Sequence, residues 1–456
     1  MGIKVSRYAI FVPREDGHII AVNTLYKTVA LIKRNDADEL HRILVSPERH
    51  LTDPAGPSAL LNALRRGLFL VDEELDEFEF LKMRSLLGKF GTEEFAVGLM
   101  PTLRCNFSCR YCYVSPQSSD MSENMQQGIL SWLSTRRFRH LICGWFGGEP
   151  MLRLDVIRMM TSAMQELCCK HGSTFSNMMS TNGYLLTPTI IRELENDLSF
   201  TSIQITLDGP PEVHNRWRPL KGGQGTFDVV FQNTANILAI SRGINVNLRI
   251  NVSEGNLEPA YNLMNILPPE FKDPRLRVYL KVAWPHPACW GERDCSEKDR
   301  EDRRALARQV LQFHKRIAYQ GYGTNFMGTF GVGGCIKCEG DYYHYFLIGP
   351  EGNLYKCTVA FEVGERFGYL TPDGKQVLDL PKLIRRMAKD PFADLHCSDC
   401  QVLPLCGGWC AYNATLGHRS CYLLDWGITS QDIAEMLYLE EHTRRKGGAS
   451  LCHPPN

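Results

Sequence analysis

Six strand-like runs separated by helix-length segments occupy residues 96 to 320, and they restrict the fold more than any other feature of the chain. The runs are VGLMPT (97–102), LICGWF (141–146), NMMSTN (177–182), SIQITL (202–207), NVNLRI (245–250) and RVYLKV (277–282). Helix-length segments between or after them include 125–136, 154–171, 227–242 and 298–319. This alternation predicts a parallel sheet, either an open doubly wound sheet or a barrel.

Distinctive short motifs stand at the ends of the first four runs. A cysteine-rich loop, CNFSCRYC, follows the first run, and GGEP (147–150) follows the second. STNG (180–183) ends the third run, and LDGP (207–210) ends the fourth. The carboxyl ends of the strands in a parallel barrel share one face, where active sites lie. We therefore expect these motifs to meet at a single site.

The cysteine-rich loop contains Cys105, Cys109 and Cys112, with the spacing C-x3-C-x2-C. Three thiolates on one tight loop can hold three irons of a [4Fe–4S] cluster and leave the fourth iron open. An open coordination position is typical of a reactive metal site. Structural zinc is the alternative, but its fourth ligand would have to come from elsewhere in the chain.

Cysteines also dominate the region after residue 330, which contains nine of the seventeen. Without a secretory signal peptide, so many cysteines indicate metal or iron–sulfur ligands rather than disulfides. Two interleaved zinc knuckles are the alternative to iron–sulfur clusters here. Cys289 and Cys295, in the loop after the sixth run, could offer a thiol to a substrate.

The cysteine loop, with Tyr111 before its last cysteine, resembles the signature of radical SAM enzymes. The resemblance covers about residues 96 to 320 and implies a partial (β/α)6 barrel. It implies that the cysteines bind a [4Fe–4S] cluster whose open iron is chelated by S-adenosylmethionine (SAM). Electron transfer from that cluster to SAM would yield a 5′-deoxyadenosyl radical. Cys105, Cys109 and Cys112 are then both metal ligands and the catalytic centre.

Other motifs match the SAM-binding segments of the same family. GGEP resembles the segment that binds the methionine amino group, with Glu149 as the acceptor for that ammonium. STNG resembles the segment near the methionine carboxylate and ribose. Asp208 could contact SAM or substrate, or could cap a helix. The implied cofactor-binding residues are Tyr111, Gly147, Gly148, Glu149, Ser180, Asn182, Asp208 and Arg249.

The C-terminal cysteines resemble a SPASM domain, which implies two auxiliary [4Fe–4S] clusters and three clusters in all. Carried over position by position, the first set of ligands is Cys335, Cys338, Cys357 and Cys410. The second set is Cys397, Cys400, Cys406 and Cys421. Both auxiliary clusters would be fully ligated by protein.

The N-terminal region contains two strand-like runs, 8–13 and 18–23, around REDG, which predict a β-hairpin. Helical segments are expected around 27–45 and 58–66. By position and arrangement the region resembles the winged-helix peptide-recognition element of ribosomal-peptide (RiPP) maturases. Such domains bind a leader peptide as an added strand at a sheet edge.

These expectations combine into an α/β fold: a partial (β/α)6 TIM-type barrel with a winged-helix-like α+β domain before it and an iron–sulfur SPASM domain after it. The expected boundaries are 1–92, 93–322 and 323–456. Lys and Arg together number 51, as do Asp and Glu, which disfavours nucleic-acid binding. No long apolar run predicts a membrane span, so a cytoplasmic protein is expected.

The resemblance implies a peptide maturase that abstracts hydrogen from a precursor peptide and forms an intramolecular side-chain crosslink (C–C, C–O or C–S). An external one-electron reductant, such as flavodoxin or ferredoxin, would serve it. One alternative is oxidation of a protein residue, as in anaerobic sulfatase maturation. Thr358 follows Cys357 where those enzymes carry an Asp, which disfavours that alternative. The other is a zinc-stabilised binding module.

Overall fold

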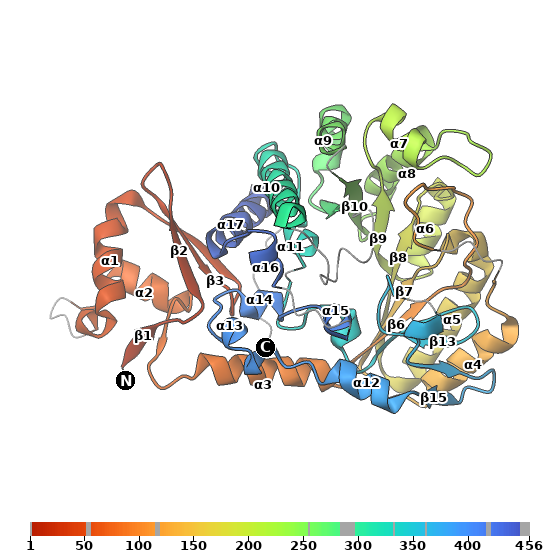
Figure 1. Cartoon of the computed structure of the whole chain (residues 1–456), viewed down its shortest axis with the longest axis horizontal. Coiled ribbons are helices and arrows are strands. Elements are labelled where there is room, and N and C mark those ends of the chain that lie inside the picture. The colour runs from red at the N-terminus through yellow and green to blue at the C-terminus, as the bar shows by residue number, and fades with distance from the viewer. Residues whose placement is uncertain are drawn as a thin grey trace.

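The computed structural model describes residues 2–51, 56–114, 119–253, 256–282, 297–331, 333–360, 363–415 and 421–446. In Figure 1 the N-terminal residues form a group of strands and helices at the left, and the central sheet with its helices lies at the right. Much of the C-terminal region lies between them, and helix α3 (Glu77–Phe90) runs along the lower edge beneath this middle part. No helix in these ranges is long and apolar enough to cross a membrane.

The six predicted strands are confirmed as a parallel sheet whose neighbours follow chain order. They are β6 (Glu94–Leu99), β7 (His140–Trp145), β8 (Thr174–Thr181), β9 (Phe200–Thr206), β10 (Asn245–Val252) and β11 (Leu276–Val282). The connecting helices include α4 (Glu123–Ser134), α5 (Leu154–His171), α6 (Pro188–Asn196), α8 (Phe227–Ile240), α9 (Leu257–Ile266) and α10 (Glu297–Tyr319). Sequential order distinguishes this barrel-type winding from a doubly wound sheet.

The two faces of this sheet differ in polarity because side chains alternate along each strand. On β11, Leu276, Val278 and Leu280 are fully buried in the main apolar core. Arg277 and Tyr279 stand between them on the opposite face and are only half-buried. β10 alternates in the same way. The sheet therefore presents one apolar face to its helices and one polar face that is free to line a site.

The N-terminal region is built around a three-stranded antiparallel sheet of β2 (Ala9–Pro13), β3 (Ile19–Asn23) and β4 (Thr28–Ile32). The predicted hairpin is confirmed as β2 and β3. A helix over 27–45 is wrong for its first part, because Lys27 adopts φ +55° and turns the chain into strand β4. Helix α1 (Ala37–Val45) begins only afterwards, and α2 (Ala59–Arg66) matches the second predicted helix. The short β1 (Ile3–Val5) pairs with β5 (Leu70–Asp72).

The C-terminal region extends the central sheet. β12 (Tyr345–Ile348) pairs in parallel with β6, and β13 (Asn353–Tyr355), β14 (Gly368–Leu370) and β15 (Gln376–Leu378) follow in antiparallel order. Helix α17 (Ser430–Lys446) then packs against β2 and β3 of the N-terminal sheet and against α10. The three regions share a sheet and a helix in this way, and the boundaries at 92 and 322 stay predictions.

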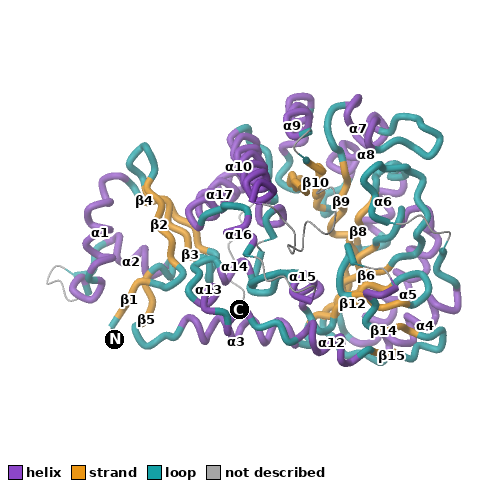
Figure 2. The backbone as a smooth tube through the Cα atoms, viewed as in Figure 1, coloured by secondary structure: helices purple, strands orange, loops and turns teal. Residues whose placement is uncertain are grey.

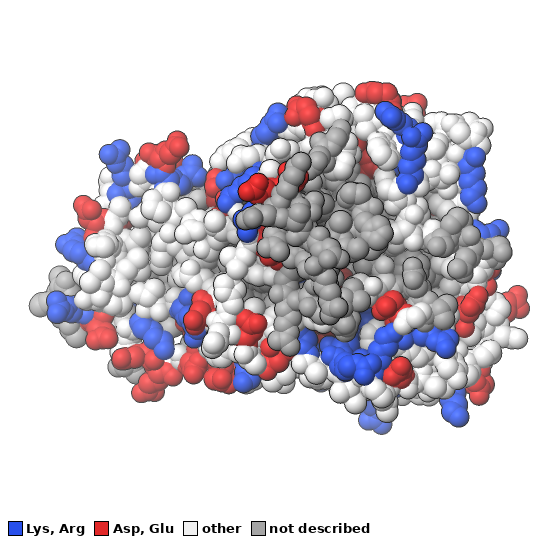
Figure 3. Space-filling model, viewed as in Figure 1, with Lys and Arg blue, Asp and Glu red and all other residues white. Residues whose placement is uncertain are grey.

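The tube view in Figure 2 shows α3 and α12 (Leu380–Met387) along the same lower edge. Lys89, at the end of α3, donates to the Lys389 carbonyl just beyond α12 at 3.1 Å. Lys, Arg, Asp and Glu side chains are interspersed over the face drawn in Figure 3. This mixed surface agrees with the balanced charge of the sequence.

Candidate functional site

The cysteine loop follows β6, as predicted. Cys105 and Cys109 are half-buried, and Cys112 is exposed. Burial raises the pKa of Cys105, and it raises the pKa of Cys109 to about 11. The charge of Cys112 would raise the pKa of both further, so the three sulfurs lie within electrostatic reach of one another. Such thiols become thiolates when a positive centre sits among them, and that donor set fits an iron–sulfur cluster.

A second segment, residues 217–221, holds this loop in place. Ser108 N donates to the Pro219 carbonyl at 2.9 Å, and Arg110 N donates to the Trp217 carbonyl at 3.1 Å. In the reverse direction, Lys221 N donates to the Asn106 carbonyl at 3.0 Å. These three backbone hydrogen bonds hold the cysteine loop in place without a bound cofactor.

Gly147 and Gly148 bring the loop after β7 into backbone contact with the cysteine loop. Gly148 N donates to the Thr102 carbonyl at 3.1 Å. A Cβ on Gly147 would lie 2.3 Å from that same oxygen, and its φ of +121° also favours glycine. A Cβ on Gly148 would lie 2.3 Å from the Arg104 carbonyl oxygen. The two glycines therefore allow two loops to touch where no side chain fits.

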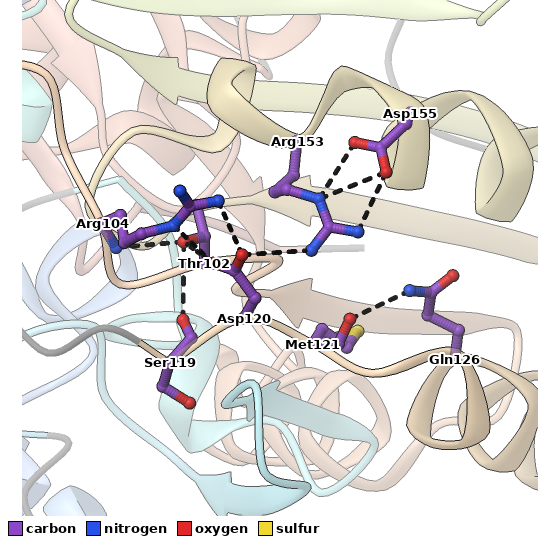
Figure 4. Close-up of polar contacts among 8 residues, drawn as sticks. All are labelled: Thr102, Arg104, Ser119, Asp120, Met121, Gln126, Arg153 and Asp155. Atoms are coloured by element: carbon purple, nitrogen blue, oxygen red, sulfur yellow. Dashed lines mark hydrogen bonds and ion pairs between the residues drawn. The ribbon is translucent and has the colours of Figure 1, made fainter.

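A carboxylate between two arginines, shown in Figure 4, reinforces the same contact. Arg104 Nη2 lies 2.6 Å from Asp120 Oδ2, and Arg153 Nη1 lies 3.5 Å from the same oxygen. Arg153 also pairs with Asp155 at 2.9 Å, at the start of α5. The network joins the chain that follows β6 to the chain that follows GGEP.

Glu149 is 1% exposed and receives three hydrogen bonds from protein. Thr181 Oγ1 and Asn182 N each donate to it at 2.7 Å, and Met151 N donates at 3.0 Å. Burial raises the pKa of this carboxyl, although the three hydrogen bonds oppose the effect. Glu149 thus connects the end of β7 to the end of β8, and its predicted contact with an ammonium stays a prediction.

The STNG residues also reach the cysteine loop. Asn182 Nδ2 donates to Asn106 Oδ1 at 2.7 Å and lies 3.9 Å from Cys105 Sγ. Ser180 lies two residues earlier, on β8, where its hydroxyl accepts from Gln204 at 2.9 Å. The structure therefore brings Asn182, but not Ser180, into contact with the cysteine loop.

A buried network joins Tyr111 of the cysteine loop to the ends of β9 and β10. The Tyr111 hydroxyl donates to Asp208, and Arg218 Nη1 donates to that hydroxyl at 2.6 Å. Asn251 Nδ2 donates to Asp208 Oδ1 at 3.0 Å, and Arg249 Nε donates to Asn251 Oδ1 at 2.9 Å. Arg249 therefore lies on the polar face with the rest of the network.

Of the two roles considered for Asp208, helix capping is wrong. Helix α7 (Pro211–Trp217) begins after Pro210, and no side chain caps it. The sequence did not identify Arg218 or Asn251 as members of this network. Arg218 lies in the segment HNRWRP, which follows LDGP. This short segment was the only feature of the sequence that could have pointed to Arg218. Its Nε is buried without a hydrogen-bond partner among the described residues, so this guanidinium retains one donor that no described protein group uses.

Within each of the two predicted sets, the C-terminal cysteines raise one another's pKa, and Cys335 is the exception. Cys410 raises the pKa of Cys338 and of Cys357, after burial as the main cause. Burial and Asp394 raise the pKa of Cys397 to about 12, and the other cysteines of the second set, Cys400, Cys406 and Cys421, contribute. Cys335 differs because Arg84 and Lys27 act on its pKa after burial. Its carbonyl accepts from Ser85 of α3 at 3.1 Å.

The ligand assignments themselves stay predictions. As the described side chains lie, no three His, Cys, Asp or Glu residues are grouped to hold a metal ion. Cys289 and Cys295 lie outside the described residues.

Tyr8, from the N-terminal region, reaches the second cysteine set. It is fully buried, and it shares an apolar cluster with Leu25, Leu81 and Leu403 against which Cys397 and Cys400 pack. Its hydroxyl has no hydrogen-bond partner among the described residues. Burial raises the pKa of Tyr8 to about 12, and Cys400 adds to the shift. A buried, unpaired hydroxyl that the Cys400 thiol influences fits a thiolate-bound cluster, whose sulfurs accept hydrogen bonds.

Comparison with known proteins gives a consistent match. Residues 99–256 match the radical SAM superfamily. Two curated relatives are both described as a serine-type anaerobic sulfatase-maturating enzyme. The Bacteroides thetaiotaomicron protein is 26% identical over 170 residues, covering 35% of this chain and 40% of that protein. The Klebsiella aerogenes protein is 22% identical over 342 residues, covering 70% of this chain and 80% of that protein.

Two solved structures share the fold. The enzyme anSMEcpe with bound AdoMet and a peptide, Cp18Cys, aligns with a TM-score of 0.53 and 18% identity, covering 77% of this chain and 99% of that one. Streptococcus suis SuiB bound to its precursor peptide SuiA aligns with a TM-score of 0.50 and 14% identity, covering 92% of this chain and 98% of that one. These similarities establish the fold of the central sheet and its helices.

Proposed function

From the radical SAM domain formed by residues 99–256, we propose that this chain is a maturase that modifies a ribosomally made peptide. Cys105, Cys109 and Cys112 would hold a [4Fe–4S] cluster, with SAM between it and the GGEP and STNG loops. When bound, this pair supplies a carbon radical able to abstract hydrogen from a substrate. The observation that carries the proposal is the cysteine loop fixed against Gly147–Gly148 and Asn182 at the strand ends.

The chain's own residues would position the reactants and exclude water. Asp208, Asn251 and Arg218 hold Tyr111, and thereby the cysteine loop, at the ends of β9 and β10. The polar face of β10 and β11, including Arg249 and Tyr279, offers hydrogen bonds to a peptide backbone. A peptide substrate is further supported by the solved relatives that carry peptides.

We further propose that the product is an intramolecular side-chain crosslink through C–C, C–O or C–S. Joining two side chains removes two hydrogen atoms, so electrons must leave the peptide. The two C-terminal cysteine sets, as ligands of two further [4Fe–4S] clusters, would provide acceptors. An external one-electron reductant such as flavodoxin or ferredoxin would start each turnover.

Co-expression with a candidate precursor peptide, followed by mass spectrometry, tests this function. A crosslink is expected to lower the peptide mass by two hydrogens and to prevent fragmentation between the joined residues. SAM should be consumed only with peptide and reductant present. An anaerobically purified, colourless protein that carries zinc instead of iron would contradict the proposal.

Oxidation of a single serine, as in sulfatase maturation, is a second candidate because both curated relatives are named for it. Thr358 beside Cys357 still disfavours it. Oxidising a serine alcohol also removes two hydrogens, so mass alone does not separate the candidates. The oxidised serine would be an aldehyde that reacts with a hydrazine, whereas a crosslinked peptide would not react.

The N-terminal sheet is our candidate for the leader-peptide site. Within the described residues β4 pairs only with β3, so its other edge is open to an added strand. Leu31, on this edge strand, is 42% exposed although it is a large apolar residue. An open strand edge with an exposed leucine is suited to an extended peptide.

Leu31→Lys is expected to weaken precursor binding at least about tenfold, because it places a charge where an apolar leader contact would be buried. Fluorescence anisotropy with a labelled precursor measures the Kd. Val45→Lys is the matched control, since Val45 is 68% exposed and lies on α1 of the same region rather than on the edge strand. Equal affinity of Leu31→Lys and wild type would remove β4 as the docking edge.

A further inference from the structure

A loop of the first cysteine set packs directly on helix α14 (Leu403–Cys406), whose last residue belongs to the second set. Helix α14 lies in the middle of Figure 1. Its Leu405 carbonyl accepts hydrogen bonds from Gly333 N at 2.6 Å and from Gly334 N at 2.9 Å, just before Cys335. Backbone contacts therefore join the two predicted sets to each other.

A glycine after α14 makes this close approach possible. Gly407 has a φ of +62°, in the left-handed region that glycine favours. A Cβ on Gly407 would lie 2.7 Å from Lys337 N and 2.9 Å from the Ile336 carbonyl carbon. The end of α14 thus lies at backbone distance from the chain between Cys335 and Cys338.

The Lys337 side chain extends from this loop to a sulfur of the second set. Its Nζ donates to Cys406 Sγ at 3.8 Å and to the Gly331 carbonyl at 2.5 Å. No other sulfur of the two sets receives a side-chain hydrogen bond within the described residues. Lys337 therefore belongs to the first set by its place in the chain and to the second by its contact.

Cys406 needs such a donor once it becomes a metal ligand. Its side chain is buried, and as a thiol it donates to the Gly408 carbonyl at 3.5 Å. A metal-bound thiolate has lost that proton and faces the same carbonyl oxygen as an anion. A buried anion is costly unless it is paired, and the Lys337 ammonium can pair with it through a charge-assisted hydrogen bond.

We propose that Lys337 is a positioning residue of the cluster held by the second set, although it comes from a loop of the first. Its ammonium holds the Cys406 thiolate in place and raises the reduction potential of that cluster. Hydrogen bonds to the sulfurs help to set such potentials, because reduction adds negative charge that a positive donor stabilises. This inference rests on the proposed cluster ligation.

Redox titration monitored by electron paramagnetic resonance tests this role in a variant whose cysteine loop carries alanine in place of its three cysteines, so that only two clusters remain. Lys337→Met is expected to shift the midpoint potential of the second cluster downward and to leave that of the first unchanged. Lys337→Arg should restore the potential, because it keeps the charge. Cys397→Ala removes a ligand of the second set only and so identifies the signal of that cluster.

Lys375→Met is the matched control, because Lys375 is exposed in the turn between β14 and β15. It should leave both potentials unchanged. Two full clusters whose potentials do not move in Lys337→Met would overturn the inference. A shift confined to the first cluster, or a shift that Lys337→Arg does not reverse, would also overturn it.

Iron content covers the case in which Lys337→Met does not retain both clusters. Loss of one cluster in Lys337→Met but not in Lys337→Arg would support the inference, since the charge separates the two variants. Loss in both variants would overturn it and leave the proposed function standing. A starting protein without two clusters would instead contradict the proposed function.

Discussion

Replacing Cys105, Cys109 and Cys112 together by alanine is expected to reduce 5′-deoxyadenosine formation to background. These three thiols are the protein ligands proposed for the cluster that SAM completes, so no other group can hold its irons. Iron should fall from about twelve to about eight per chain, since one of three four-iron clusters is lost. Chromatographic assay of deoxyadenosine with the candidate precursor peptide present and dithionite as reductant, together with iron analysis, measures both effects.

Cys169→Ala is the matched control, because Cys169 is an exposed cysteine of α5 outside the three proposed sets. It should retain full iron and full activity. Deoxyadenosine formation by the triple variant would contradict the assignment, and so would an unchanged iron content.

Gly148→Ala is expected to lower deoxyadenosine formation by about a hundredfold or more. The new Cβ would lie 2.3 Å from the Arg104 carbonyl oxygen and 2.5 Å from that of Leu103, and backbone atoms cannot swing aside as a side chain can. The cysteine loop must therefore shift, and a displacement of about 1 Å at a reacting centre can cost two orders of magnitude in rate. The same assay, run on protein normalised to iron content, measures the loss.

Gly364→Ala separates this effect from a general cost of replacing glycine. Gly364 is exposed, and a Cβ there would meet nothing within 4 Å. It should behave as wild type. Retention of more than half the activity by Gly148→Ala would show that the two loops do not need their close contact.

The central sheet could be predicted from the sequence because its signals are local. Buried parallel strands are short apolar runs, and each run here is followed by a helix-length segment. The placement of GGEP and STNG beside the cysteine loop follows from the parallel order alone. Strand β4 was missed because its five residues are read as helix until the turn at Lys27 is seen.

Long-range contacts were beyond the same reasoning. The pairing of β12 with β6 joins residues about 250 positions apart, and no local period indicates it. The sequence could not predict the contact between Arg218 and Tyr111, because the two residues are 107 positions apart. Spacing could group the C-terminal cysteines, whereas it could not indicate the hydrogen bond from Ser85 of α3 to the Cys335 carbonyl, which spans 250 positions of the chain.

The position of Tyr8 limits how the N-terminal region of this chain can be exchanged if the proposed function is to be kept. Exchanging the first 92 residues for those of another enzyme is an obvious route to a new leader specificity. Such a chimera would also replace Tyr8, which shares an apolar cluster with Leu403 against which Cys397 and Cys400 pack. It would also have to present a backbone carbonyl where that of Ala9 accepts from Gln401 at 2.8 Å. A transplanted domain must therefore bring an equivalent tyrosine and the surface that receives Gln401. The region proposed to bind the leader and the region proposed to hold the second auxiliary cluster therefore share one apolar cluster and cannot be exchanged independently.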